Sequence, residues 1–363
     1  MNPVSERIAC ETHKSGVITF ARFMQLALYC PDCGYYEKEG DSPGRHGDFF
    51  TSVSVGNLFG HLLACQFAEW LGAPREASDR MRIVEAGAHD GKLAEDILLW
   101  LRERRPALHD RVEYVIVEPS PRRRGWQERR LAGCGDHLRW IDGLAELPGQ
   151  SVRGVIFSNE LLDAMPVHRF GWDGLRKEWF EWGVCLKDGQ FRWERMPPAV
   201  SRCPPPVLPD ALLNLLPDGF IAEACPAAEA WWREAAGALG NGRLLTIDFG
   251  LSAEEFLLPE RARGTLRAYR RHHATADLLA DPGEQDLTAH VNFTAIQSAG
   301  EAAGLRTEAI TTQARFLTQI AERVWRRPAG FGAWTPDRTR QFQTLTHPVH
   351  LGRPFRVLIQ SRD

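Results

Sequence analysis

The chain has 363 residues, of which 44% are hydrophobic and 25% are charged, as in an ordinary folded globular protein. Its 44 Lys and Arg residues oppose 47 Asp and Glu residues, giving a net charge of −3, so no basic field would collect nucleic acid. No stretch approaches the roughly 20 apolar residues of a membrane span, and residues 1–16 lack the long apolar run of a signal peptide. We therefore expect a cytoplasmic protein without nucleic-acid partners or a membrane span.

The N-terminal region is predicted to be helical. Thr19 can cap a helix that runs to about Tyr29, and apolar residues at helical spacing from Leu58 indicate a second helix that ends near Gly72. From residue 81 the pattern changes to alternating strands and helices, which indicates a doubly wound α/β sheet. We therefore expect a helical N-terminal region at 1–80 and a core at 81–363.

The eight cysteines are scattered along the chain. A chain of this length needs no disulfides to fold, so we expect free thiols in a reducing compartment. Cys30 and Cys33 form the one C-x-x-C pair. With no second pair nearby, we interpret them as incidental thiols around a turn, and a zinc or redox role is the less favoured alternative.

The core is predicted from its apolar runs and helical periodicity. Strands are expected at 81–86, 112–118, 137–141, 152–158, 243–249, 306–311 and 355–360, and clear helices at 92–104 and 226–239. A segment at about 165–225 interrupts the alternation. Within it, two strand-like runs around the turn 187–190 predict a Trp-rich hairpin inserted into the sheet fold, and a proline-rich surface passage follows.

The first core strand runs into a glycine-rich turn, where residues 85–91 read Glu-Ala-Gly-Ala-His-Asp-Gly. Glu85, Gly87 and Gly91 follow the acid-x-Gly-x-Gly-x-Gly spacing of S-adenosylmethionine (SAM) methyltransferases, not the Gly-x-Gly-x-x-Gly of dinucleotide enzymes. His89 stands where the middle glycine is expected. Bare backbone and the N–H groups at the start of a helix suit a cofactor. The loop therefore predicts SAM binding, and a simple glycine turn is the alternative.

Acids at the ends of the next strands are candidates for the rest of this site. Glu118 ends the second strand, where it can accept both ribose hydroxyls, and Asp142 follows the third, where it can accept the adenine amino group. The fourth strand delivers Asn159, Glu160 and Asp163 to the same edge. If the chain turns helically there, the two carboxylates project to one side. Solvated surface acids and a local cap are the alternatives.

The chain resembles the MidA-like family of SAM-dependent methyltransferases over nearly its whole length. Mitochondrial members of that family assist assembly of respiratory complex I by dimethylating an arginine of one of its subunits. The blocks that carry the resemblance are GYY at 34–36, GDFFTS at 47–52, FG at 59–60, the loop 85–91, NE at 159–160, DAMPV at 163–167, IDFG at 247–250, TLRAY at 265–269, RH at 271–272, DLT at 286–288, VNF at 291–293, Gln313, FL at 316–317 and FRVL at 355–358.

The resemblance implies a class I methyltransferase core, which is a Rossmann-like doubly wound sheet, with a helical N-terminal extension and an inserted segment that covers the cleft. Three groups of residues then receive expected roles. The SAM site would comprise Glu85, Gly87, His89, Gly91, Glu118, Asp142 and Asn159. The catalytic residues facing the acceptor would be Asn159, Glu160 and Asp163. The substrate-contacting residues in the 47–52 segment would be Asp48, Phe49, Thr51 and Ser52.

The expected reaction is methyl transfer from SAM to an arginine guanidinium of a protein, and the resemblance makes a respiratory-complex subunit the expected partner. A guanidinium is charged and weakly nucleophilic, so a carboxylate must orient it and accept its proton. We expect Glu160 in this role, with Asp163 orienting or relaying and His272 or His273 assisting. The alternative is a non-catalytic assembly or interaction protein that keeps the fold. The sequence leaves a homodimer open.

Overall fold

The computed structural model describes residues 2–38, 51–72, 81–135, 137–198, 203–270, 273–275, 277–326 and 330–363. Contacts divide the chain into two units. The N-terminal unit comprises Met1–Asp41, Asp163–Ala230 and Leu251–Thr294, and the sheet unit comprises Ser42–Leu162, Trp231–Gly250 and Ala295–Asp363. This grouping differs from the expected boundary at residue 80. The helix that begins at Leu58 packs in the sheet unit, and the inserted segment at about 165–225 groups with the first residues of the chain.

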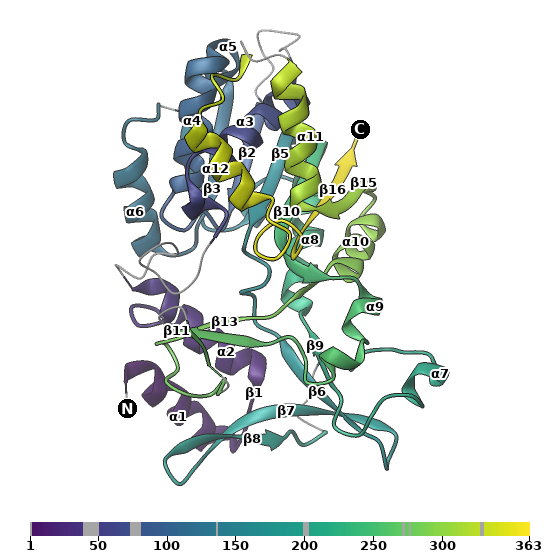
Figure 1. Cartoon of the computed structure of the whole chain (residues 1–363). Helices are drawn as coiled ribbons and strands as arrows, with labels where there is room; N and C mark the ends of the chain where they lie inside the picture. The colour runs from purple at the N-terminus through teal and green to yellow at the C-terminus, as the bar shows by residue number, and fades with distance from the viewer. Residues whose placement is uncertain are drawn as a thin grey trace. The chain divides into compact units, whose positions relative to one another are not determined.

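The sheet unit is built on strands in the order β15-β16-β10-β5-β2-β3-β4. Figure 1 labels these strands from β15 to β3. The five strands from β10 to β4 run parallel, and β16 and β15 continue the sheet in antiparallel pairing. The strand bounds are β2 Met81–Ala86, β3 Val112–Val117, β4 Leu138–Ile141, β5 Val152–Asn159, β10 Leu239–Leu251, β15 Arg306–Thr312 and β16 Phe355–Arg362. The predicted doubly wound sheet is therefore confirmed.

Helices pack on both faces of this sheet. Phe157, Ile247 and Val357 share one core with apolar residues of α3, α4 and α11. Successive strand residues face opposite sides, and Gln360 of β16 accordingly binds Trp232 of α8 and the carbonyl of Gln297 in α10. The helices and 3₁₀ turns are α3 Leu58–Leu71, α4 Lys92–Arg104, α5 Pro106–His109, α6 Pro121–Leu131, α8 Pro226–Ala238, α10 Phe293–Ala302, α11 Gln313–Arg326, α12 Pro336–Leu345, η2 Val53–Val55 and η3 Leu144–Glu146.

The N-terminal unit combines helices with small antiparallel sheets. The Thr19 side chain caps α2 by accepting from the Arg22 amide, as predicted. One sheet has the order β1-β7-β6-β9 with β8 paired to β7, and another has the order β12-β11-β13. The bounds are α1 Pro3–Ser15, β1 Ile18–Thr19, α2 Phe20–Tyr29, η1 Tyr35–Glu37, β6 His168–Asp173, β7 Glu178–Lys187, β8 Gln190–Arg195, α7 Asp210–Leu213, β9 Ile221–Ala224, α9 Ala253–Phe256, η4 Pro259–Arg261, β11 Arg267–Arg270, β12 His273–Thr275, β13 Asp286–Thr288 and β14 Val291–Asn292.

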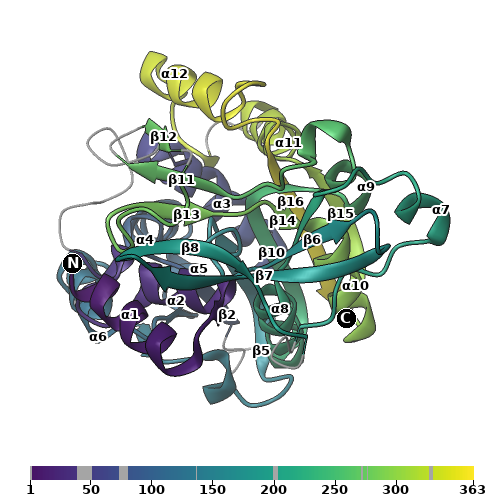
Figure 2. The same cartoon turned by 90° about the horizontal axis from the view of Figure 1, so that it is seen from below.

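The Trp-rich hairpin forms as predicted, in the segment that interrupts the alternation of strands and helices. Figure 2 shows β8 alongside β7, joined through Asp188 and Gly189, whose positive φ angles of 51° and 75° suit a two-residue hairpin turn. In the same sheet β7 also pairs with β1 and β6, so the inserted hairpin belongs to a sheet separate from the doubly wound one. Among the described residues, no helix is long and apolar enough to cross a membrane.

Candidate active site

The glycine loop between β2 and α4 contains three left-handed residues. Gly87, His89 and Gly91 have φ angles of 81°, 48° and 85°. This conformation is cheap for glycine and costs other residues roughly 1–2 kcal/mol. A Cβ atom on Gly87 would lie 3.1 Å from the Cβ of Leu161, so the loop also passes close to the chain that follows β5. The expected loop geometry is thus retained although histidine replaces a glycine.

Gln127 of α6 binds the backbone of the loop. Its Nε2 atom donates to the carbonyl oxygen of His89 and to Oε2 of Glu118, both at 2.9 Å, and its Oε1 accepts from Trp140 at 2.9 Å. Sequence reasoning missed this fully buried residue. The available signal was its spacing of four residues from buried Leu131, which places both on the inner face of the helix.

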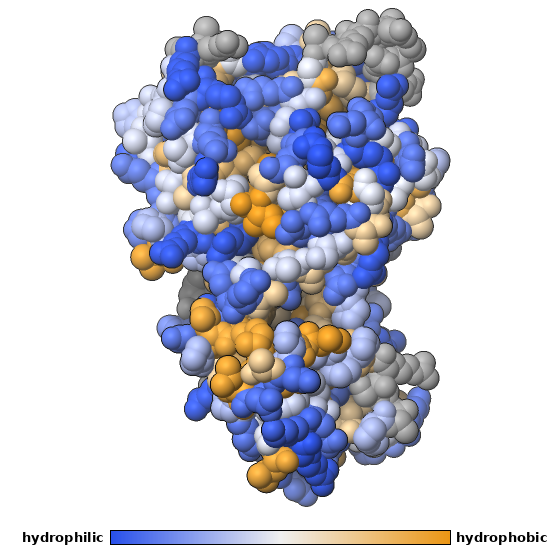
Figure 3. Space-filling view, turned by 90° about the vertical axis from the view of Figure 1, so that its right-hand side faces the viewer, coloured by the Kyte–Doolittle hydropathy of each residue, from blue (hydrophilic) through white to orange (hydrophobic). Residues whose placement is uncertain are grey.

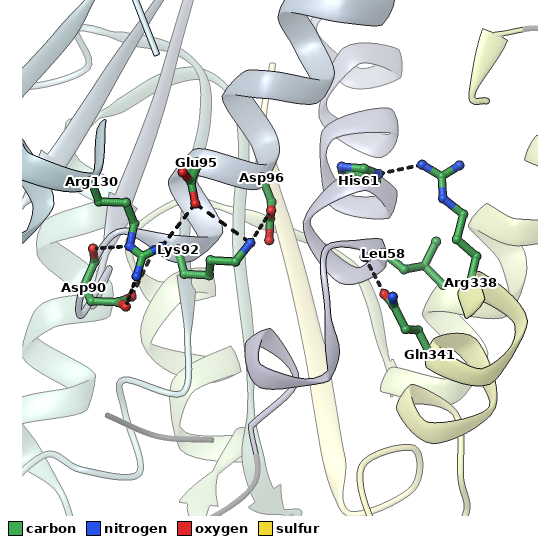
Figure 4. A network of polar contacts seen from close by, with 9 residues as sticks. All are labelled: Leu58, His61, Asp90, Lys92, Glu95, Asp96, Arg130, Arg338 and Gln341. Atoms are coloured by element: carbon green, nitrogen blue, oxygen red, sulfur yellow. Dashed lines mark hydrogen bonds and ion pairs between the residues drawn. The ribbon is translucent and has the colours of Figure 1, made fainter. Parts of the chain in front are cut away.

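The far end of the loop is held by charged contacts, which Figure 4 shows around the start of α4. Arg130 donates to Oδ2 of Asp90 at 2.7 Å, and Oδ1 of Asp90 accepts from the backbone of Lys92 at 3.1 Å. Burial would raise the pKa of Asp90, but the His89 ring and the Arg130 guanidinium outweigh it and lower the pKa to about 2. Asp90 is therefore ionised and secures the turn into α4.

Glu118 lies directly after β3, as expected, and is 3% exposed. Its Oε1 accepts from the Ser120 amide at 2.9 Å and from Arg123 Nε at 3.0 Å, while Oε2 accepts from Gln127. An ionised carboxylate offers about four acceptor positions, so ribose hydroxyls would share Glu118 with these donors. Its role in the cofactor site stays a prediction.

The other two expected cofactor acids have contrasting surroundings. Asp142, after β4, has an exposed side chain that pairs with Arg124 at 2.6 Å. Glu85 is 2% exposed at the end of β2 and its Oε2 accepts from the Tyr114 hydroxyl at 2.7 Å. Burial raises the pKa of Glu85 to about 7. The Asp142 side chain is therefore accessible to a ligand, whereas the Glu85 side chain is buried and bound to Tyr114.

Asn159 and Glu160 follow at the end of the adjacent strand β5. Glu160 adopts a left-handed φ of 51°, and its Oε1 accepts from Asn159 Nδ2 and from the Ser52 amide, both at 3.1 Å. Ser52 is itself fixed through its hydroxyl, which donates to Gln313 Oε1 at 3.0 Å. The structure thus brings the 51–52 segment and the end of β5 together, as the resemblance implied.

Asp248 of β10 shapes the turn after Glu160. Its Oδ2 accepts from the amides of Leu161 and Leu162 at 3.1 and 2.8 Å, and its Oδ1 accepts from the Phe249 amide. Residues 160–163 do not form the helical turn that would have set Glu160 and Asp163 on one side, because Glu160 has a left-handed φ of 51°. The position of this acid in the IDFG block was noted from sequence, but its role was not.

The other residues predicted for the site lie in different parts of the chain's structure or outside the described residues. Asp163 lies in the N-terminal unit, where its carbonyl oxygen accepts from the Ala289 amide at 2.9 Å, so its pairing with Glu160 stays a prediction. Thr51 is buried beside Ser52. Asp48, Phe49 and His272 lie outside the described residues, and His273 is exposed on β12.

Comparison with known proteins identifies the family. Residues 62–311 match the family described as "Putative S-adenosyl-L-methionine-dependent methyltransferase". The chain belongs to this methyltransferase family. A solved structure from Burkholderia thailandensis, described as a candidate methyltransferase and bound to S-adenosyl-homocysteine, is 32% identical, covers 99% of this chain and 92% of that one, and has a TM-score of 0.81.

Curated relatives of this methyltransferase carry a more specific name. "Protein arginine methyltransferase NDUFAF7, mitochondrial" from Xenopus laevis is 27% identical over 344 residues, covering 83% of this chain and 71% of the relative. The protein of the same name from Homo sapiens is 26% identical over 324 residues, covering 81% and 68%. These are relatives of moderate identity, so they support the reaction class more firmly than the acceptor.

The residues of this methyltransferase fit SAM, which the family uses as its methyl donor. Gly87 is exposed and presents backbone without a side chain. On the neighbouring strand, Oδ1 of Asn159 is buried and has no hydrogen-bond partner among the described residues. Buried acceptors are normally satisfied, so this atom suits a donor group of a ligand. Gly87, Gly91, Glu118 and Asn159 are the residues that would hold the donor.

Proposed function

We propose that this methyltransferase modifies an arginine side chain of a protein. The names of its curated relatives support an arginine acceptor, and the placement of Glu160 supports it chemically. When bound, SAM supplies an electrophilic methyl group on its sulfonium. The protein must then orient the acceptor nitrogen and take up the proton that it loses.

The observation that carries the proposal is the fixed carboxylate of Glu160. Two donors bind the same oxygen, Oε1, so the carboxylate is held in one orientation at the end of β5. A planar guanidinium is recognised by carboxylate oxygens through directed N–H bonds. Glu160 can therefore align the guanidinium and accept its proton. A neutral hydroxyl acceptor would need a base as well, but it has no positive charge for a carboxylate to orient.

We further propose that Asp163 orients the guanidinium or relays its proton, with help from His272 or His273. Contact with the acceptor protein is assigned to Asp48, Phe49, Thr51 and Ser52. We extend the proposal to a respiratory-complex subunit as acceptor, a cytoplasmic location and a homodimer. The face in Figure 3 is mainly hydrophilic with separate hydrophobic areas, which is compatible with docking of a folded protein partner.

The test combines binding with acceptor identification. The purified protein is titrated with SAM by calorimetry, then incubated with labelled SAM and an extract of its own organism, and the labelled protein is hydrolysed. We expect SAM binding and label in methylarginine. Label in lysine or in a small molecule would overturn the arginine proposal, and failure to bind SAM would favour the non-catalytic alternative.

A further inference from the structure

A pair of thiols lies at the end of α2 in the N-terminal unit. Cys30 caps the helix and is 2% exposed, whereas Cys33 is partly exposed. The Cys33 thiol donates to Cys30 with the two Sγ atoms 3.1 Å apart. A disulfide bond is about 2.05 Å long, so closing the pair requires the two sulfur atoms to approach by about 1 Å.

The backbone, and not only the side-chain rotamers, holds these thiols together. The amides of Cys33 and Gly34 donate to the Cys30 carbonyl at 3.2 and 2.7 Å, and Asp32 adopts a left-handed φ of 64°. A Cβ atom on Gly34 would lie 2.5 Å from the Cys30 nitrogen. The turn is therefore tight, and it keeps the two sulfur atoms at a high effective concentration toward each other.

A guanidinium group faces the more buried sulfur. Nη1 of Arg7, from α1, donates to Cys30 Sγ at 3.6 Å. A cation beside a sulfur atom stabilises its thiolate, which is the form that attacks disulfides. Burial and the hydrogen bond to Cys30 raise the pKa of the Cys33 thiol to about 11. The Cys33 thiol is therefore protonated at neutral pH, and the Arg7 guanidinium beside Cys30 Sγ is placed to speed the exchange.

We propose that Cys30 and Cys33 are a reversible redox site that forms an intramolecular disulfide by exchange with a small-molecule disulfide such as glutathione disulfide. One thiolate attacks the oxidant and releases one glutathione. The second cysteine loses its proton, attacks the mixed disulfide at the protein sulfur and releases the second glutathione. Two protein thiols are oxidised and one glutathione disulfide is reduced to two thiols. The bond ties the end of α2 to the residue before the GYY block at 34–36.

The test measures the disulfide directly. The full chain is equilibrated without oxygen in glutathione buffers of increasing oxidised fraction, quenched in acid, alkylated and digested with trypsin. The expected peptide, 23–38, contains both cysteines and no other. In oxidising buffer we expect this peptide to carry no alkyl group and to be two hydrogen atoms lighter than the unmodified reduced peptide. In reducing buffer we expect it to carry two alkyl groups.

Two kinds of variant serve as controls. Cys33→Ser, or Cys33→Ala if the serine variant does not fold, should leave Cys30 unable to form the bond. Arg7→Gln should slow disulfide formation by about threefold to tenfold, and Arg7→Lys should restore most of the rate. The exposed, isolated Cys10 reports the reactivity of an ordinary thiol. If peptide 23–38 keeps both thiols, or carries only glutathione, in buffers where Cys10 is already glutathionylated, the proposal is wrong.

Discussion

The backbone amide of Ser52 donates a 3.1 Å hydrogen bond to Oε1 of Glu160, across 108 positions of sequence. Asn159 binds the same oxygen from the neighbouring position, and Gln313 fixes the Ser52 side chain. The orientation of the Glu160 carboxylate, the proposed proton acceptor, therefore depends on three separate segments of the sheet unit.

Glu160→Gln should abolish most methyl transfer while preserving SAM binding. The amide keeps the shape of the side chain but carries no charge to pair with a guanidinium and cannot take up its proton. Loss of a general base typically costs about 10²–10⁴-fold in rate, so kcat should fall by about that factor with SAM affinity changed less than about threefold. Glu234→Gln, on the exposed side of α8, is the matched control. Near-normal turnover by Glu160→Gln would remove this residue from the mechanism.

Glu118→Ala should weaken SAM binding by about 1.5–3 kcal/mol, the value of charge-assisted hydrogen bonds. Calorimetry measures the change, and circular dichroism shows whether the loss of the Gln127 and Arg123 contacts also affects folding. Glu113→Gln alters the other acid at β3, which pairs with Arg82 on the opposite end of the strand, and should bind SAM normally. Equal affinity of the wild type and a folded Glu118→Ala protein would contradict the ribose assignment.

His89→Gly should change both the free energy of unfolding and the SAM affinity only slightly. His89 occupies φ of 48°, where a side chain costs roughly 1–2 kcal/mol, and glycine's greater freedom in the unfolded chain offsets part of that gain. We expect the free energy of unfolding to rise by at most about 1 kcal/mol and SAM affinity to change less than about tenfold. Gly87→Ala, by contrast, should destabilise the fold. A glycine variant that binds SAM when the native protein does not would favour the non-catalytic alternative.

Asp248→Asn should loosen the turn that carries Glu160. The carboxylate accepts from three backbone amides, two of them at Leu161 and Leu162, and hydrogen bonds to a charged group contribute about 1.5–3 kcal/mol. Hydrogen exchange at Leu161 and Leu162 should accelerate, and turnover should fall together with it. Asp337→Asn changes an exposed aspartate of α12 and should do neither. Unchanged exchange at both amides would show that Asp248 does not hold the turn.

Glu85 should make the folded protein less stable as pH rises. Its pKa is raised by burial from 4.5 to about 7, so the folded state binds the proton more tightly than the unfolded state. Its contribution is fully present below pH 4.5 and is lost as pH rises through about 7, by about 3 kcal/mol in total. Glu85→Gln should remove this dependence. Denaturant unfolding of both proteins at pH 5 and 8 measures it, and parallel pH profiles would contradict the shift.

Much of the sheet was predictable because its signals are local. Buried parallel strands are largely apolar on both faces, so β2, β3 and β5 stand out as short apolar runs with few polar residues, and the predicted ranges agree with the observed bounds within a residue. Thr19 capping α2 and the two-residue turn at Asp188 also follow from short-range chemistry. The hairpin's partners did not, because pairing of β7 with β1 depends on residues far apart in sequence.

The candidate active site, like the sheet, has features that follow from local sequence and others that depend on distant residues. From the sequence alone we could predict the glycine loop, the acids that end the strands and the likeness to a methyltransferase family, because each depends on residue type and spacing. Three relationships appear only in the folded chain: Gln127 joins the loop to Glu118, Asp248 binds the amides of Leu161 and Leu162, and Ser52 orients Glu160. Those contacts join side chains and amides from separate segments, and no local pattern specifies which buried donor meets which acceptor.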